Sequence, residues 1–169
     1  ESTRHTEAVS ELCARLPTPC DYLSLDEEAR MQLLSGLLNN PVSMPVRNTL
    51  DETTLETLAV LDVMADMRKE ISADAFGSYV ISMTHHASHV LELMWLASLC
   101  GLAGRDGEHW YCELRISPLF ETIDDLARIE KVIGRLLDEP AYRKLVAASG
   151  NLQEIMLGYS DSCKDGGIL

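Results

Sequence analysis

The sequence predicts a helix-rich α/β fold, and three observations support this prediction. Residues 1–75 carry only helical patterns, interrupted by proline and asparagine. In residues 76–169, three β-prone runs alternate with helical patterns, which is typical of βα units whose strands pair in parallel. With 169 residues, 46% of them hydrophobic and 24% charged, the chain has the length and composition of one globular unit with a single core.

The N-terminal part is expected to form three helices. They span residues 6–16, 25–38 and 51–69. Pro17 and Pro19 end the first helix, because proline removes a backbone donor and clashes with the preceding turn. Asp51 is placed to cap the third helix, and the breakers within residues 39–45 predict a loop between the second and third.

The C-terminal part is expected to alternate strands and helices. The predicted strands span residues 78–83, 111–117 and 153–159. The predicted helices span residues 87–100, 124–137 and 141–148. Gly101 ends the first of these helices, and residues 104–107 predict a polar turn. The pattern fits an open parallel sheet and a closed barrel equally well.

Polar side chains follow the second and third predicted strands, where functional groups of parallel α/β folds gather. Glu121 comes after the second strand and Asp161 after the third. If these strands are neighbours, the two carboxylates lie at one edge and can share a hard divalent cation such as magnesium. Lys164 follows Asp161 by three residues and would add a positive charge beside the metal.

Each of these residues also has a simpler interpretation. Glu121 precedes a predicted helix, where an acidic side chain often complements the helix dipole, and the loop of residues 160–167 is typical of a solvated turn. His85 and His89 are four residues apart, which suggests a zinc site. No third ligand has a suitable spacing, so capping or packing roles are favoured for these histidines.

Four segments resemble the phosphoenolpyruvate carboxylase family. Residues 155–167, with the sequence IMLGYSDSCKDGG, resemble the family's lysine-containing active-site motif at thirteen consecutive positions. Residues 118–126 (PLFETIDDL) look like its second metal-ligand segment. Residues 1–7 (ESTRHTE) look like the end of its R-Q-E-S-x-R-H-T segment, and residues 79–83 (YVISM) match a family strand. The resemblance covers the whole chain, in the family's order.

The resemblance implies a (β/α)8 TIM-like barrel, of which this chain would supply three parallel strands and additional helices. It implies carboxylation of phosphoenolpyruvate with bicarbonate to give oxaloacetate and phosphate, with Mg2+ or Mn2+ as cofactor. Carried over by position, Glu121 and Asp161 would bind the metal and Lys164 would be the catalytic lysine. Arg4 would lie near the substrate, and the full-length protein would be a homotetramer.

The family's catalytic histidine segment and its G-R-G-G arginine loop have no counterpart here. Residues 1–169 are therefore expected to be a single segment of the barrel, incomplete at both ends and inactive alone. The net charge of −13 argues against nucleic acid or an anionic membrane as partner. No apolar run is long enough to span a bilayer, and five scattered cysteines indicate a reducing compartment, so the expected location is the cytoplasm.

Two competing functions remain. One is another magnesium-dependent barrel enzyme that acts on phosphoenolpyruvate or pyruvate, since such barrels also bind metal through a Glu and an Asp. The other is a non-catalytic helical interaction module, in which the acidic surface serves solubility.

Overall fold

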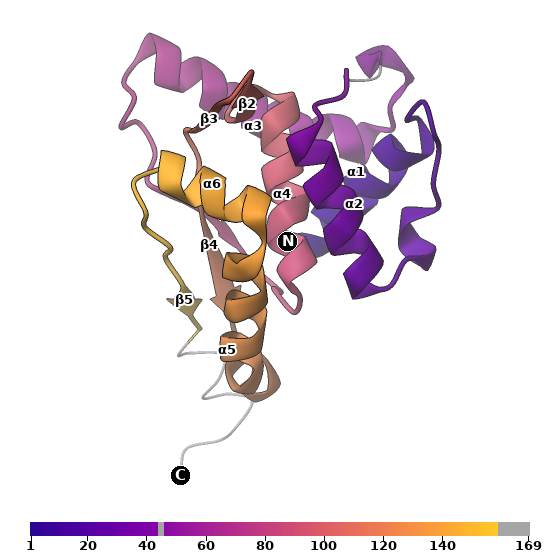
Figure 1. The fold of residues 1–169 in the computed structure, drawn as a ribbon. Coiled ribbons are helices and arrows are strands. Elements are labelled where there is room, and N and C mark those ends of the chain that lie inside the picture. Colours follow the sequence, from indigo (N-terminus) through magenta and orange to yellow (C-terminus); the bar gives the residue numbers. More distant parts are fainter. Residues whose placement is uncertain (44–45, 159–169) are drawn as a thin grey trace.

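The computed structural model describes residues 1–43 and 46–158. Within these residues, the N-terminal part contains three α-helices, labelled in Figure 1, and two short 3-10 helices. These are α1 (Ser2–Ala14), η1 (Tyr22–Ser24), α2 (Glu27–Asn39), η2 (Arg47–Thr49) and α3 (Glu52–Glu70). The three predicted helices are confirmed, with shifted ends.

The start of α1 differs most from its prediction, because the helix begins four residues earlier, at Ser2. The backbone amide of Ser2 donates to the Ser82 carbonyl at 3.1 Å, so a contact distant in sequence fixes this end. At α2, the Asp26 carboxylate accepts from the Ala29 amide at 2.8 Å, as a cap should. Asp51 stands at the predicted position before α3, but its side chain makes no capping hydrogen bond.

The C-terminal part contains five strands and three α-helices within the described residues. These are β1 (Ser78–Ile81), α4 (Ala87–Leu99), β2 (Ala103–Asp106), β3 (His109–Cys112), β4 (Arg115–Phe120), α5 (Ile123–Asp138), α6 (Pro140–Ala148) and β5 (Met156–Leu157). The division into a helical part and a part built of strands and helices agrees with the sequence.

Three strands form a parallel sheet in the order β1-β4-β5. Ser78 of β1 pairs with Arg115 of β4, and Ile81 pairs with Pro118. At the other side of β4, Leu119 pairs with Met156 of β5. The second and third strands of the βα units are neighbours, which is the condition that a site shared between their ends requires. Their carboxyl ends meet at one edge, toward the lower end of Figure 1.

A β-hairpin corrects the prediction between α4 and β4. Residues 104–107, expected to be a turn, mostly belong to β2, which pairs antiparallel with β3. The predicted strand 111–117 is split, because β3 ends at Cys112 and β4 starts at Arg115. Gly104 makes the hairpin possible: its φ is +146°, and a Cβ there would lie 3.1 Å from the Tyr111 hydroxyl.

The third strand is also shorter than predicted, since only Met156–Leu157 are extended and paired within the described residues. The side chain of Gln153, expected to begin the strand, donates to the Ile116 carbonyl at 3.0 Å. At this point a side-chain hydrogen bond to β4 therefore takes the place of the backbone hydrogen bonds of a paired strand. The last residue of the predicted strand, Tyr159, lies outside the described residues.

Helix α4 is the centre of the core, because every residue from Ala87 to Ala97 is buried. It packs against α1, α2, α3 and α5, and Trp95 is the largest fully buried side chain. A helix that is apolar on all sides is typical of such a central position. The described cysteines are all free thiols: Cys13 and Cys112 are buried, and Cys20 and Cys100 are half-buried.

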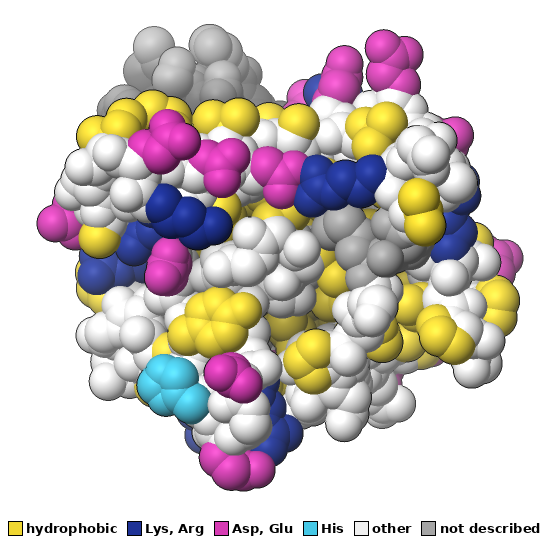
Figure 2. Space-filling model, turned by 90° about the horizontal axis from the view of Figure 1, so that it is seen from above, with side chains coloured by type: hydrophobic (Ala, Val, Ile, Leu, Met, Phe, Trp, Pro, Cys, Tyr) yellow, Lys and Arg dark blue, Asp and Glu magenta, His cyan; other side chains and the backbone are white. Residues whose placement is uncertain are grey.

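The surface carries mixed charge on the face seen in Figure 2, where acidic and basic side chains alternate with hydrophobic ones. This face therefore presents no large field of one sign despite the net charge of −13. Among the helices in residues 1–43 and 46–158, none combines the length and apolarity that crossing a membrane requires.

Candidate functional site

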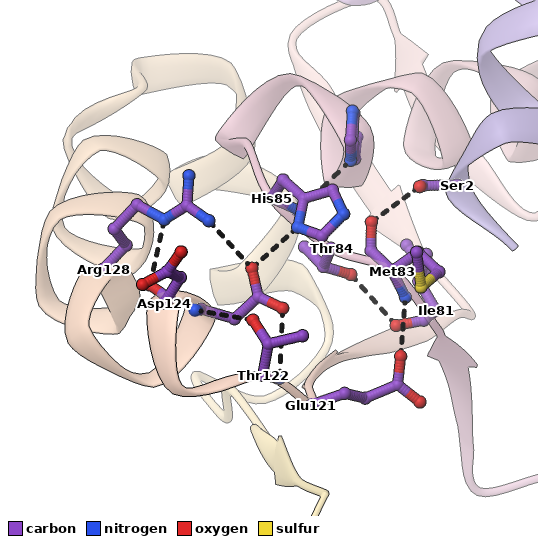
Figure 3. Close-up of polar contacts among 11 residues, drawn as sticks. Ser2, Ile81, Met83, Thr84, His85, Glu121, Thr122, Asp124 and Arg128 are labelled. Atoms are coloured by element: carbon purple, nitrogen blue, oxygen red, sulfur yellow. Dashed lines mark hydrogen bonds and ion pairs between the residues drawn. The ribbon is translucent and has the colours of Figure 1, made fainter. Parts of the chain in front are cut away.

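The candidate site lies where β1, β4 and β5 end. Glu121 directly follows β4, and its carboxylate Oε2 accepts a hydrogen bond from the Met83 amide at 3.3 Å (Figure 3). Met83 is in the turn that follows β1. The two segments are 38 residues apart in sequence and meet because β1 and β4 are parallel neighbours. Glu121 is thus fixed at the edge where parallel α/β folds carry their functional groups.

The turn after β1 adopts an unusual backbone conformation. Met83 has a φ of +58°, in the left-handed region of backbone conformation that residues other than glycine rarely occupy. Three hydrogen bonds hold the turn: Thr84 Oγ1 donates to the Ile81 carbonyl at 3.0 Å, Ser2 Oγ donates to the Met83 carbonyl at 2.7 Å, and the Ser2 amide donates to Ser82. Such a conformation persists only where its surroundings enforce it, and it directs the Met83 amide toward Glu121.

Gly158 brings the end of β5 against Glu121. Its amide donates to the Phe120 carbonyl at 2.8 Å. A Cβ on residue 158 would lie 3.1 Å from both Cα and Cγ of Glu121. Gly158, which comes three residues before Asp161 in the sequence, therefore lies directly against Glu121. Asp161 and Lys164 themselves lie outside the described residues, so a metal site shared by Glu121 and Asp161 stays a prediction.

Gly158→Ala is expected to displace Glu121, because the added methyl group is closer to Glu121 than carbon atoms normally approach. In the full-length protein we expect the affinity for Mn2+ to fall roughly tenfold, about 1.4 kcal/mol, which is typical of a modest steric change at a packed position. Electron paramagnetic resonance of Mn2+ measures this directly. Gly134→Ala on α5 is the matched control, since nothing lies within 4 Å of its added Cβ; equal affinity in both variants would contradict the steric argument.

A buried carboxylate, Asp125, organises the start of α5 beside this edge. It accepts from His85 Nδ1 at 2.7 Å and from Arg128 at 3.2 Å, and only 2% of its side chain is exposed. It also forms a reciprocal capping box with Thr122. Burial alone would raise the pKa of Asp125, but the hydrogen bonds from His85 and Thr122 outweigh it, so this pKa is below its ordinary value. This arrangement was not predicted from the sequence, although the spacing of Thr122 and Asp125 is a capping-box signal.

The structure gives no support to a zinc site among the histidines. His85 precedes α4 and its Nδ1 is engaged by Asp125, so His85 and His89 do not share a helix face. Burial lowers the pKa of His89 to about 4, and the ring packs against His86 with centroids 5.3 Å apart. Within residues 1–43 and 46–158, no three His, Cys, Asp or Glu side chains are placed to hold a metal ion.

Arg4 lies on the first turn of α1, close in sequence to Ser2. Its guanidinium forms an ion pair with Glu56 of α3 at 2.5 Å, and both side chains are half exposed. It is thus held by α3 rather than by Glu121 or the turn after β1. A substrate role for Arg4 stays a prediction.

A sequence model of one protein family, phosphoenolpyruvate carboxylase, matches residues 1–169. The chain belongs to the phosphoenolpyruvate carboxylase family. The phosphoenolpyruvate carboxylase of Mycobacterium leprae (strain TN) is 44% identical over 166 residues, which cover 98% of this chain. Those of Parasynechococcus marenigrum (strain WH8102) and Rhodothermus marinus are 40% and 41% identical, covering 100% and 98% of this chain.

The chain spans only 17–18% of the length of these phosphoenolpyruvate carboxylases. It therefore corresponds to a segment of each relative. Within this segment, residues 155–167, which resemble the family's active-site motif, begin one residue before β5, and residues 118–126 contain the end of β4 and Glu121.

Proposed function

We propose that this chain is the part of a phosphoenolpyruvate carboxylase that supplies the metal-binding carboxylates and one catalytic lysine. The enzyme is a lyase that converts phosphoenolpyruvate and bicarbonate to oxaloacetate and phosphate. The observation that supports this most strongly is the position of Glu121, at the carboxyl end of β4 and in contact with Gly158 of the active-site motif. The neighbouring strand ends bring the two motif segments together, as a shared site requires.

The donor atoms suit a hard divalent cation. Glu121 contributes carboxylate oxygens, and its Oε2 is fixed by the Met83 amide. With the Asp161 carboxylate it would hold Mg2+ or Mn2+, which prefer oxygen ligands. When bound, the ion supplies positive charge for the phosphate and enolate oxygens of the substrate.

The residues of this chain have distinct proposed roles. Lys164 places an ammonium group beside the bicarbonate that attacks the phosphoryl group. The turn after β1 fixes Oε2 of Glu121 through the Met83 amide, so that the carboxylate needs no rearrangement when substrate binds. The site must also exclude water, because a proton captured by the enolate would give pyruvate instead of oxaloacetate.

The larger architecture is part of the same proposal. The parallel β1-β4-β5 sheet, with α4 and α5 in its crossover connections, would be one arc of a (β/α)8 barrel. We place the enzyme in the cytoplasm, as a homotetramer.

Oxaloacetate formation tests the proposed function. The full-length protein that contains this segment is expected to oxidise NADH in an assay coupled through malate dehydrogenase, only when phosphoenolpyruvate, bicarbonate and Mg2+ are all present. Residues 1–169 alone are expected to give no signal. Activity of the full-length protein that is independent of bicarbonate would contradict the proposal and favour a different reaction of phosphoenolpyruvate.

A further inference from the structure

A carboxyl group is buried in the apolar helix at the centre of the core. Glu92 of α4 is 0% exposed. One of its oxygens, Oε1, accepts from the Tyr22 hydroxyl at 2.8 Å, and the other, Oε2, lies 2.7 Å from Thr6 Oγ1. A buried carboxyl group is costly unless it is neutral or well paired. Glu92 has no part in the site described above, so its presence in the core needs an explanation.

The geometry around Thr6 favours a neutral Glu92. Thr6 Oγ1 lies within hydrogen-bond distance of two acceptors, Oε2 of Glu92 at 2.7 Å and the Ser2 carbonyl at 3.2 Å. A hydroxyl group has one proton, so it cannot donate to both. When Glu92 is protonated, its Oε2 donates to Thr6 and Thr6 donates to Ser2, so both contacts become hydrogen bonds.

The same contacts continue from Ser2 to the candidate site. Ser2 is 2% exposed, and it donates from its hydroxyl to the Met83 carbonyl and from its amide to the Ser82 carbonyl. The Met83 amide then donates to Glu121, as Figure 3 shows for the last part of the series. A continuous series of contacts thus runs from Glu92 in the core through Thr6, Ser2 and Met83 to Glu121.

We propose that Glu92 is a positioning residue for Glu121, acting through Thr6 and Ser2 on the turn after β1. This inference rests on the proposed role of Glu121 as a metal ligand. Glu92 and Thr6 fix the first turn of α1, and Ser2 in that turn holds Met83 in its left-handed conformation. Without this anchor the turn relaxes toward an ordinary backbone conformation, and the Met83 amide leaves the Glu121 carboxylate.

The charges near Glu92 are consistent with a neutral carboxyl group. Burial raises the pKa of Glu92 to about 7, against the opposing effect of hydrogen bonds from Thr6 and Tyr22. Two charged groups of α2 act from a greater distance: Arg30, whose guanidinium lies 4.9 Å from the centre of the Tyr22 ring, lowers this pKa, and Glu27 raises it. Cys13 of α1 is a further titratable neighbour, whose own pKa is raised by burial and, to a smaller degree, by Glu92.

The protonation of Glu92 predicts how the turn responds to pH. Because the pKa of Glu92 is raised above its ordinary value, the hydrogen bond from Thr6 to the Ser2 carbonyl is complete at low pH. It is lost as the pH rises through about 7, since Thr6 then donates its one proton to the ionised carboxylate. Deuterium exchange of the Met83 amide, corrected for the intrinsic rate, is expected to lose up to about tenfold of its protection between pH 6 and pH 8. A protection factor that is constant over this range would contradict a titrating Glu92.

Two substitutions of Glu92 distinguish its proposed positioning role from the effect of filling its buried position. In Glu92→Gln, the side-chain amide can donate to Thr6 and its oxygen can accept from Tyr22, so it imitates the protonated acid at every pH. Glu92→Met has a similar volume and no hydrogen bond. Leu96→Val, at a fully buried position of the same helix without polar contacts, is the control for a weakened core.

The experiment measures Mn2+ affinity by electron paramagnetic resonance, and Met83 exchange without metal, in the full-length protein. Glu92→Gln should keep the affinity of the native protein within about twofold and remove the pH dependence of exchange. Glu92→Met should weaken Mn2+ binding and accelerate exchange, each at least about tenfold. Leu96→Val should change neither. Thr6→Val interrupts the same series at a half-buried residue and should match Glu92→Met, which keeps the test decisive if Glu92→Met fails to fold.

Native Mn2+ affinity and native Met83 exchange in both Glu92→Met and Thr6→Val would overturn the inference, and so would equal losses in Leu96→Val. Glu121→Gln distinguishes this result from failure of the proposed function. If Glu121→Gln binds Mn2+ as well as the native protein does, the metal role itself fails. If Glu121→Gln loses Mn2+ while Glu92→Met keeps it, only the positioning role of Glu92 fails.

Discussion

Glu121→Gln is expected to reduce kcat of the full-length carboxylase by roughly 10²- to 10³-fold, as removal of one group that stabilises charge in a transition state typically does. The amide has nearly the shape of the carboxylate and can still accept from the Met83 amide, so the local fold should persist. What is lost is the negative charge that would hold the divalent cation. The reduction is measured in the malate dehydrogenase assay at saturating Mg2+, together with the Mg2+ concentration that gives half-maximal rate.

Glu130→Gln provides the matched control for this charge change. Glu130 is an exposed residue of α5, and neutralising it alters the net charge by the same amount. We expect its kcat to remain within about twofold of the native value, as for surface substitutions generally. If Glu121→Gln behaved like Glu130→Gln, Glu121 would be only a residue at the start of a helix, which is the simpler interpretation that its sequence position also allows.

The sequence predicted the elements whose signals are local. Proline after α1 and the alternation of strands with helices are visible in short windows, and both agree with the structure. The β2-β3 hairpin was missed because Gly104 looks like a turn residue. In the structure its missing side chain accommodates the Tyr111 hydroxyl, seven residues away, which no local pattern indicates.

The candidate site was predicted less completely, for a similar reason. The place of Glu121 follows from its position after a strand, and the pairing of β4 with β5 agrees with that reasoning. The groups that hold it do not follow from sequence. The Met83 amide points toward Glu121 only because residue 83 has a positive φ, and Ser2 reaches that turn from 81 residues away. Backbone conformation and tertiary distance leave no signature in a single sequence.

Asp125→Ala is expected to lower the free energy of unfolding by about 2–3 kcal/mol. The change removes the Asp125 half of the α5 capping box, a hydrogen bond from the Thr122 amide that is worth about 1 kcal/mol, and also the buried acceptor of His85 and Arg128. The second contribution is reduced because His85 and Arg128 are partly exposed, so water can solvate them after the loss. Urea unfolding of the full-length protein measures the loss of stability. Deuterium exchange of the α5 amides measures how much protection this helix loses.

Asp124→Ala is the control that isolates the buried carboxylate, because Asp124 is exposed in the same helical turn and only its backbone carbonyl accepts from Arg128.

The two variants should also differ in their response to acid. The pKa of Asp125 is below its ordinary value, so its stabilising effect is present above that ordinary value and disappears as the pH falls through the lowered one. The native protein and Asp125→Ala should therefore converge in stability toward low pH, whereas the native protein and Asp124→Ala should differ little throughout. A constant gap between native protein and Asp125→Ala down to pH 3 would mean that lost packing, rather than lost charge, weakens the start of α5.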